Sequence, residues 1–108
     1  MDAHDLLVKV PDAVDPGALQ GMDATIQYEI ERPLAHVVRD GTVSVVEGTI
    51  DRPDVVISAA DALLLDLYGG RANPAMAFMM GKLRIRGDAG IAQRLVAAVD
   101  RSRLPLPD

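Results

Sequence analysis

The chain contains no cysteine, so its 108 residues offer no disulfide, no thiolate metal ligand and no cysteine nucleophile. It has no tryptophan and only three aromatic side chains, Tyr28, Tyr68 and Phe78. The core must therefore be aliphatic and methionine-based, and such a core adapts easily around a cavity. The two histidines, His4 and His36, and the scattered carboxylates lack the spacing of a metal site, so we expect no metal and no cofactor.

Long apolar runs are also missing: none approaches the roughly 20 residues that a membrane-spanning helix needs. The first residues lack the basic segment and apolar stretch of a signal peptide, so we expect a cytoplasmic protein. Residues 1–70 hold 13 acidic and 4 basic residues, whereas residues 71–108 hold 3 acidic and 7 basic. The net charge of −5 argues against nucleic acid as a partner. The basic portion could contact an anionic headgroup or a partner, although a solvated face is the commoner explanation.

Alternation of apolar and polar residues predicts most of the strands. The five expected strands lie at residues 25–31, 34–39, 42–47, 54–58 and 82–86. Asp40 and Gly41 form a hairpin turn signal between the second and third, because both central positions of such a turn need positive φ. The fourth run is short and β-branched, which is typical of a buried strand. The fifth carries three cations on one face, which is typical of a sheet edge.

Helices are expected after the fourth and fifth strands, at residues 61–68, 74–80 and 89–99. Asn73 and Asp88 are N-cap candidates for the last two. Residues 1–23 are treated as an N-terminal arm: Leu6–Val10 predicts a short strand or docking segment, and residues 15–22 a single helical turn starting at Pro16. Residues 102–108 are expected to be a loose tail. Strands that precede helices indicate one α+β domain over residues 1–108, with helices covering one sheet face.

The residues available for catalysis are few. His36 and Ser44 lie on neighbouring predicted strands, with Asp40 and Glu47 nearby as acids. No nucleophile elbow or helix N-terminus faces them, and His36 is more typical of a strand surface. Gly81-Lys82 lacks the upstream glycine and the following Ser or Thr of a phosphate loop. By contrast, Met76, Met79 and Met80 recur at i, i+3 and i+4. Ordinary core packing explains such a stripe most often, but it also suits an adaptable apolar site.

Several segments in a fixed order carry a family resemblance. They are Asp40-Gly41, Gly48, Asp54-Val55-Val56-Ile57, the leucine-rich helix ending at Gly70, Asn73-Pro74, and Gly81-Lys82-Leu83-Arg84-Ile85-Arg86-Gly87-Asp88. From about Ala24 to Val99 their order and spacing resemble the sterol carrier protein 2 (SCP-2) sterol-binding domain. The resemblance implies a five-stranded, mostly antiparallel sheet with helices on one face. It also implies binding, transfer or presentation of a sterol, fatty acid or fatty acyl chain in an apolar tunnel, without catalysis.

The tunnel lining is inferred from the inward-facing pattern. The expected ligand-binding residues are Val45, Ile57, Leu64, Leu67, Tyr68, Met76, Met79, Met80, Leu95 and Val99. Two departures from the family pattern concern the ends of the chain. The segment before the first strand is short, so the cavity is expected to be open, shallow or closed by a second copy, and Leu106-Pro107-Asp108 lacks a peroxisomal Ser-Lys-Leu type signal.

Two alternatives to lipid binding stay open at this point. One is a ligand-free interaction module that kept the fold and pairs as a homodimer through an uncovered apolar surface. The other is an accessory enzyme that acts on a hydrophobic metabolite, with His36, Asp40 or Tyr68 as acid or base.

Overall fold

The computed structural model describes residues 1–15 and 17–105. The elements are α1 (Ala3–Ala13), β1 (Ala24–Glu29), β2 (Leu34–Arg39), β3 (Thr42–Glu47), β4 (Val55–Ala59), α2 (Asp61–Tyr68), α3 (Pro74–Met79), β5 (Leu83–Gly87), α4 (Ala89–Ala98) and the 3₁₀ helix η1 (Arg101–Arg103). The strands form one sheet in the order β3-β2-β1-β4-β5. Only the β1–β4 pair is parallel among the described strands. The predicted α+β class and mostly antiparallel five-stranded sheet are confirmed.

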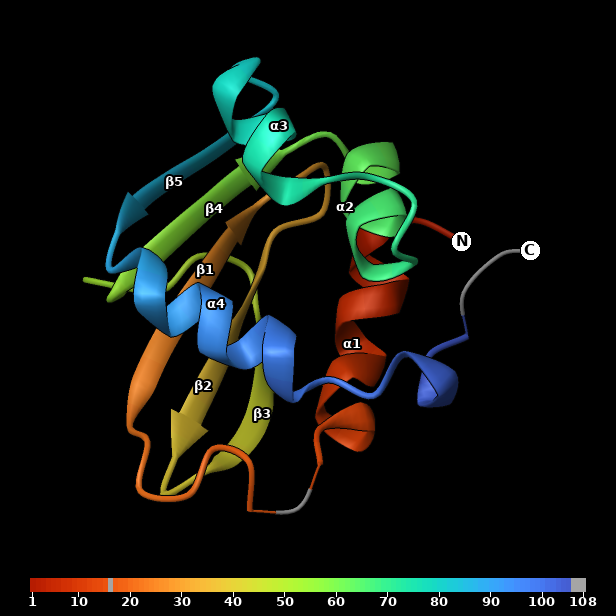
Figure 1. Ribbon diagram of the computed structural model, residues 1–108. Coiled ribbons are helices and arrows are strands. Elements are labelled where there is room, and N and C mark those ends of the chain that lie inside the picture. Colours follow the sequence, from red (N-terminus) through yellow and green to blue (C-terminus); the bar gives the residue numbers. More distant parts are fainter. Residues whose placement is uncertain (16, 106–108) are drawn as a thin grey trace.

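Sheet and helices form two layers, with the helices on one face of the sheet (Figure 1). The predicted hairpin joins β2 to β3, with Asp40 at φ 49° and Gly41 at φ 79°. At the opposite edge, β5 pairs only with β4 among the described strands, as its outward-facing cations indicated.

The segment that leads from β3 to β4 crosses the sheet face opposite the helices, where it covers Gln27. The Gln27 amide nitrogen donates to the carbonyls of Leu34 and Gly48, and its amide oxygen accepts from the Ile50 N–H at 2.9 Å. These bonds satisfy a polar side chain that is only 2% exposed. They also fix the crossover that allows β4 to run parallel to β1.

The expectation of a strand or arm at Leu6–Val10 is wrong, because this segment lies within the 11-residue helix α1. Asp2 caps the helix and accepts from the Asp5 N–H, and the guanidinium of Arg32 binds both of these carboxylates. The buried face of α1 packs beside β3 and α2; its buried residues are Ala3, Leu6, Leu7, Val10 and Ala13. The sheet near β3 is therefore covered, which removes the uncovered surface on which the dimerisation alternative rested.

Two other terminal expectations change. Residues 17–21 form turns rather than a helical turn, and the expected start of that turn, Pro16, lies outside the described residues. The tail predicted at residues 102–108 is not loose at its start, because residues 102 and 103 belong to η1 and Leu104 is buried in the core, only 7% exposed. Residues 106–108 of that tail lie outside the described residues.

Candidate functional site

An apolar pocket with a volume of about 360 Å³ lies between the helix-covered face of the sheet and the helices. Strands β1, β4 and β5 form its floor, and α2, α4 and the first residue of α3 form its walls. Its lining consists of Tyr28, Ile57, Leu64, Leu67, Tyr68, Pro74, Leu83, Ile85, Ala92, Gln93, Val96, Ala97, Val99 and Arg101. A mostly apolar wall with a few polar groups is the usual character of a site for a hydrophobic ligand.

The sheet register explains how the floor is assembled. Tyr28 lies opposite Ile57 across the parallel β1–β4 pair, and Ile57 lies opposite Ile85 across β4–β5. Residues in register on neighbouring strands point to the same face, so these three side chains form one row beneath the helices. The pocket floor therefore depends on the pairing of strands that are far apart in the sequence.

The polar groups beneath the pocket form a buried chain of hydrogen bonds that begins in α1. Pro11 has no N–H, so the Leu7 carbonyl lacks its usual partner four residues on and accepts from His36 Nε2 at 2.8 Å. Because Nε2 carries the proton, Nδ1 is the acceptor, and the Tyr28 hydroxyl donates to it at 3.0 Å. The two rings meet edge to face, with centroids 4.9 Å apart. His36 thereby positions Tyr28 on the pocket floor.

Burial determines the protonation of these groups. It lowers the pKa of His36 to about 4, against the opposing effect of the bond to Leu7, so the imidazole is neutral at physiological pH. Burial also raises the pKa of Tyr28 and of Tyr68, whose side chains neighbour one another. The inner end of the pocket therefore presents neutral hydroxyl-bearing rings and no charge.

Among the described residues that line the pocket, Arg101 is the one with a charged side chain, and it is exposed. Its guanidinium packs so closely over Gly70 that a Cβ there would collide with Nη1, and Gly70 has φ +75°. Within the described residues no carboxylate pairs with Arg101. The carboxylate next to it in sequence, Asp100, instead accepts hydrogen bonds from Ser102 and pairs with Arg103. The pocket mouth thus combines one cation with the exposed amide of Gln93.

Five of the ten residues expected to bind ligand line this pocket: Ile57, Leu64, Leu67, Tyr68 and Val99. Leu95 faces the core and is only 1% exposed, and Val45 is half-buried on β3, beyond β2 from the pocket floor. Neither lines the pocket.

The inward orientation expected for Met76, Met79 and Met80 is wrong. Their exposed fractions are 59%, 84% and 61%, and the buried residue of α3 is Ala77. The helix has only six residues and rests on β5 through its smallest side chain, which brings its backbone close to the sheet and turns the long side chains outward. Pro74 alone of this helix reaches the pocket lining.

Sequence reasoning missed several lining residues for which a signal existed. Leu83 and Ile85 alternate with the three cations of the fifth predicted strand, which indicates that they face inward, and Ala92 lies beside Ile91 and Leu95 in the last predicted helix, but none was assigned to the pocket. Tyr28 could have been found from its alternation with Ile26. Gln93 and Arg101 are exposed polar residues, and only the packing of α4 and η1 beside α2 brings them to the mouth.

The structure separates the two residues considered for a catalytic dyad, His36 and Ser44. His36 is fully buried rather than on a strand surface, since it faces the helices. It lies opposite Val45, whereas Ser44 lies opposite Val37 and is exposed on the other face. Asp2, His4 and Asp5 gather their polar atoms within 4.8 Å of one another, but Arg32 already binds both carboxylates and His4 bonds to Glu47.

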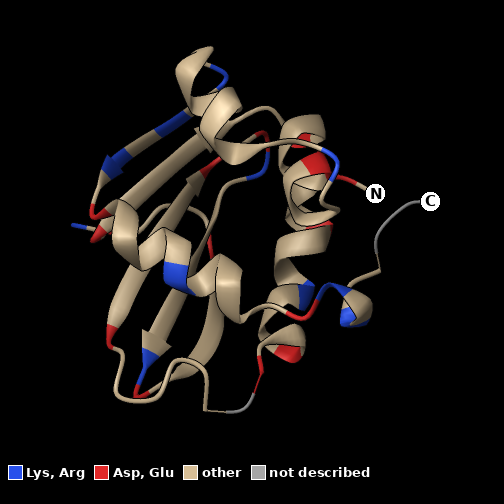
Figure 2. Ribbon diagram, in the orientation of Figure 1, with Lys and Arg blue, Asp and Glu red and all other residues tan. Residues whose placement is uncertain are grey.

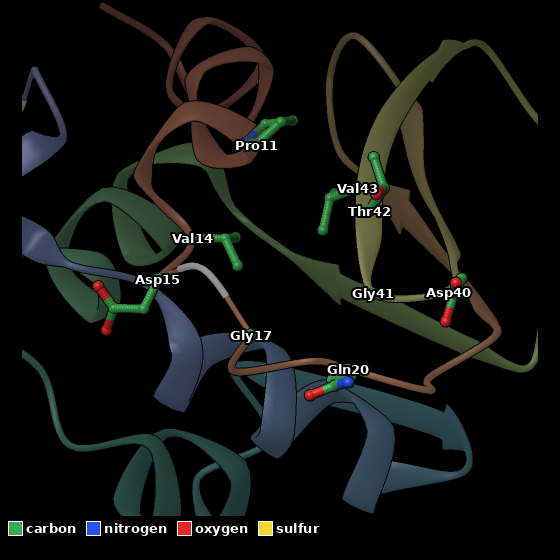
Figure 3. Close-up of a pocket in the computed structure, with 9 residues that line it drawn as sticks. All are labelled: Pro11, Val14, Asp15, Gly17, Gln20, Asp40, Gly41, Thr42 and Val43. Carbon is green, nitrogen blue, oxygen red and sulfur yellow. The ribbon is translucent and has the colours of Figure 1, made fainter.

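A second hollow of about 290 Å³ lies between the end of α1, the turn after it and the β2–β3 hairpin (Figure 3). Acidic residues, Asp15 and Asp40, and apolar residues, Val14 and Val43, are among those that line it. Mixed polar and apolar walls make it less suited than the first pocket to a hydrophobic ligand.

Together the fold and the first pocket define an α+β domain of the lipid-binding type, in which a mixed sheet and a helical layer enclose an apolar site. The chain belongs to the SCP-2 sterol transfer family, whose model matches residues 4–100. Family membership supports lipid binding or transfer in general, and the family's domain is a binding unit rather than a catalytic one. Within the described residues no helix is long and apolar enough to cross a membrane.

Curated relatives and solved structures agree with this assignment. Sterol carrier protein 2 of Bos taurus is 41% identical over 58 residues, which is 54% of this chain and 11% of that protein; the Homo sapiens protein is 40% identical over 58 residues. The match thus spans about a tenth of those relatives' length.

Two solved structures share the fold. Palmitated SCP2L2 from Aedes aegypti has a TM-score of 0.68 and 22% identity, covering 90% of this chain and 93% of that one. The sec-alkylsulfatase Pisa1 from Pseudomonas sp. has a TM-score of 0.78 and 18% identity, covering 84% of this chain and 15% of that one.

Proposed function

We propose that this protein binds a single-chain acyl lipid, with the chain in the apolar pocket and a polar or anionic headgroup at the mouth near Arg101. The observation that carries the proposal is the pocket itself, which has apolar walls, a neutral inner end and one cation at its opening. An amphiphile with one tail and one headgroup matches that distribution of polarity. The Aedes aegypti protein of the same fold, which is palmitated, supports an acyl ligand.

The volume also favours an acyl chain over a whole sterol. A cavity of roughly 150 Å³ accepts one benzene ring, so a pocket of about 360 Å³ holds about 14 carbon atoms by the same ratio. That length corresponds to most of a fatty acyl chain. A sterol with its side chain is larger and would require the helical layer to move.

Titration of the purified protein with a fluorescent fatty acid tests this function. We expect saturable binding that palmitate displaces more strongly than cholesterol does. Ala97→Trp should weaken binding at least about tenfold, because the indole would occupy pocket volume from an exposed position on α4. Arg94→Trp is the matched control, since Arg94 is exposed on the same helix and does not line the pocket. Absence of saturable binding, or equal effects of both variants, would overturn the proposal.

The headgroup assignment has its own test. Arg101→Leu should weaken binding of a fatty acid several-fold while leaving binding of the corresponding alcohol nearly unchanged, because only the carboxylate gains from the guanidinium. Equal loss for acid and alcohol would show that Arg101 contributes packing rather than charge recognition. Met79→Trp tests whether α3, whose methionines face solvent in the structure, moves onto the ligand when it binds: unchanged acyl binding would exclude the methionines from the binding site.

A further inference from the structure

Helix α3 lies at one end of the sheet, beyond β4 and β5 (Figure 1). Large apolar side chains of this helix and of its C-cap residue Met80 are exposed to solvent. Met76, Phe78, Met79 and Met80 are all more than half exposed, and Met79 is the most exposed of them. Ala77 rather than these residues holds the helix against the sheet. Exposed apolar side chains grouped on one short helix usually mark an interaction surface.

The stretch of sequence that contains this cluster carries charge of one sign. Residues 67–87 contain Arg71, Lys82, Arg84 and Arg86 and no acidic residue, although the whole chain has a net charge of −5. Arg71 pairs with Asp66 and Arg86 with Glu29. Lys82 and Arg84 are exposed and form no ion pair among the described residues. Figure 2 shows basic segments, and no acidic one, along β5 and the connection from α3 to β5.

We propose that Met76, Phe78, Met79 and Met80, with Lys82 and Arg84 (together, the methionine tip), dock the protein on the surface of an anionic lipid bilayer. Flexible thioethers and a phenyl ring can enter the boundary between headgroups and acyl chains. Lys82, whose N–H donates to the Ala77 carbonyl of α3, and Arg84, two residues further on in β5, can attract anionic headgroups. The inference goes beyond the proposed function and does not require that a ligand occupies the pocket.

Charge complementarity favours a bilayer over a second copy of this chain. A symmetric contact through the methionine tip would bring Lys82 and Arg84 of both copies together, and like charges at an interface oppose association. An anionic bilayer supplies the opposite charge and a deformable apolar layer for four irregular side chains. The occupant assigned to the tip is therefore a membrane surface.

The geometry relates the tip to the pocket. Pro74, the first residue of α3, lines the pocket, while the methionines of the same helix point outward. A protein docked through α3 would thus hold one wall of its pocket next to the bilayer. That arrangement suits exchange of a lipid between pocket and membrane.

Vesicle cosedimentation of the full chain tests the proposal, using phosphatidylcholine vesicles with and without about 30 mol% phosphatidylglycerol. We expect binding to the anionic vesicles that falls with added salt. Met79→Ser/Met80→Ser and Lys82→Glu/Arg84→Glu should each reduce the partition coefficient about tenfold or more. All four side chains are exposed, so thermal unfolding and circular dichroism should match the wild type.

Matched controls lie elsewhere on the surface. Val46→Ser removes an exposed apolar side chain from β3, and Arg39→Glu/Arg52→Glu produces the same change in net charge as Lys82→Glu/Arg84→Glu. The controls should retain wild-type binding to anionic vesicles, apart from a small general charge effect. The proposal is overturned if tip and control variants bind equally, if the wild type does not bind, or if light scattering finds a dimer that the tip variants abolish.

Discussion

The imidazole of His36 is hydrogen-bonded at both nitrogens and fully shielded from water. Its folded pKa of about 4 lies below the ordinary value of 6.5. Between these two pH values the unfolded chain binds a proton that the folded chain does not. The resulting stability is complete above pH 6.5 and is lost as the pH falls towards 4, by up to about 3 kcal/mol.

Urea unfolding between pH 7.5 and 4.5 tests this assignment. The free energy of unfolding of the wild type should fall with decreasing pH, and His36→Gln should show a much shallower fall below pH 6.5, whatever its absolute stability. His4→Gln is the control, because His4 bonds to Glu47 and takes no part in the buried chain of hydrogen bonds through His36. Parallel pH profiles for wild type and His36→Gln would contradict a neutral, buried imidazole.

At the scale of elements, Gly87 joins β5 to α4 and illustrates why a single glycine can determine a corner. It has φ +100°, and a Cβ there would collide with the Asp54 carbonyl oxygen and lie 3.1 Å from Val55 Cα. Gly81, at the other end of β5, has φ +74° and open space around it. The two positions share a backbone preference and differ in steric surroundings.

Alanine at these two positions should therefore have unequal effects. Gly87→Ala should lower the free energy of unfolding by about 3 kcal/mol or more, from backbone strain and displacement of β4. Gly81→Ala should cost about 1 kcal/mol, from the left-handed conformation alone. Denaturant unfolding of both variants measures the difference. Equal decreases in the free energy of unfolding would show that β4 moves away from a Cβ at position 87 without a measurable loss of stability.

The elements also show where sequence reasoning succeeds and fails. The hairpin at Asp40-Gly41 and helix α2 are local features with their own turn and end signals, and both were predicted. Helix α1 was missed because Val8, Val10 and Pro11 argue against a helix. Its buried positions nevertheless recur at i, i+3, i+4 and i+7, and the missing N–H of Pro11 is offset by the bond from His36, which no local pattern contains.

The candidate pocket was predicted only in part, for a related reason: five of the ten expected residues line it, and they are five of its fourteen lining residues. Ile57 and Tyr68 follow from inward-facing patterns within single elements. The orientation of α3 does not, because a six-residue helix with apolar side chains on several faces can rest on any of them. Contact through Ala77 is decided by how closely α3 approaches β5, a tertiary property. Arg101 likewise reaches the pocket only through the packing of η1.

At the scale of the whole molecule, the proposed acyl pocket and methionine tip make a joint prediction about lipid transfer. If the tip docks first, a fluorescent fatty acid should leave the protein faster as acceptor vesicles become more concentrated and more anionic. Ligand that escapes through water would leave at a rate set by dissociation alone, independent of the vesicles.

Stopped-flow transfer from the loaded protein to vesicles separates these routes. Lys82→Glu/Arg84→Glu should slow transfer to anionic vesicles about tenfold, since electrostatic attraction mainly raises the association rate. It should leave the affinity for the fatty acid unchanged, because neither residue lines the pocket. Ala97→Trp should do the reverse, weakening the affinity while membrane docking persists. The joint prediction is contradicted if the protein binds the fatty acid but the transfer rate does not depend on vesicle concentration. In that case the methionine tip has no role in lipid exchange between the pocket and the membrane.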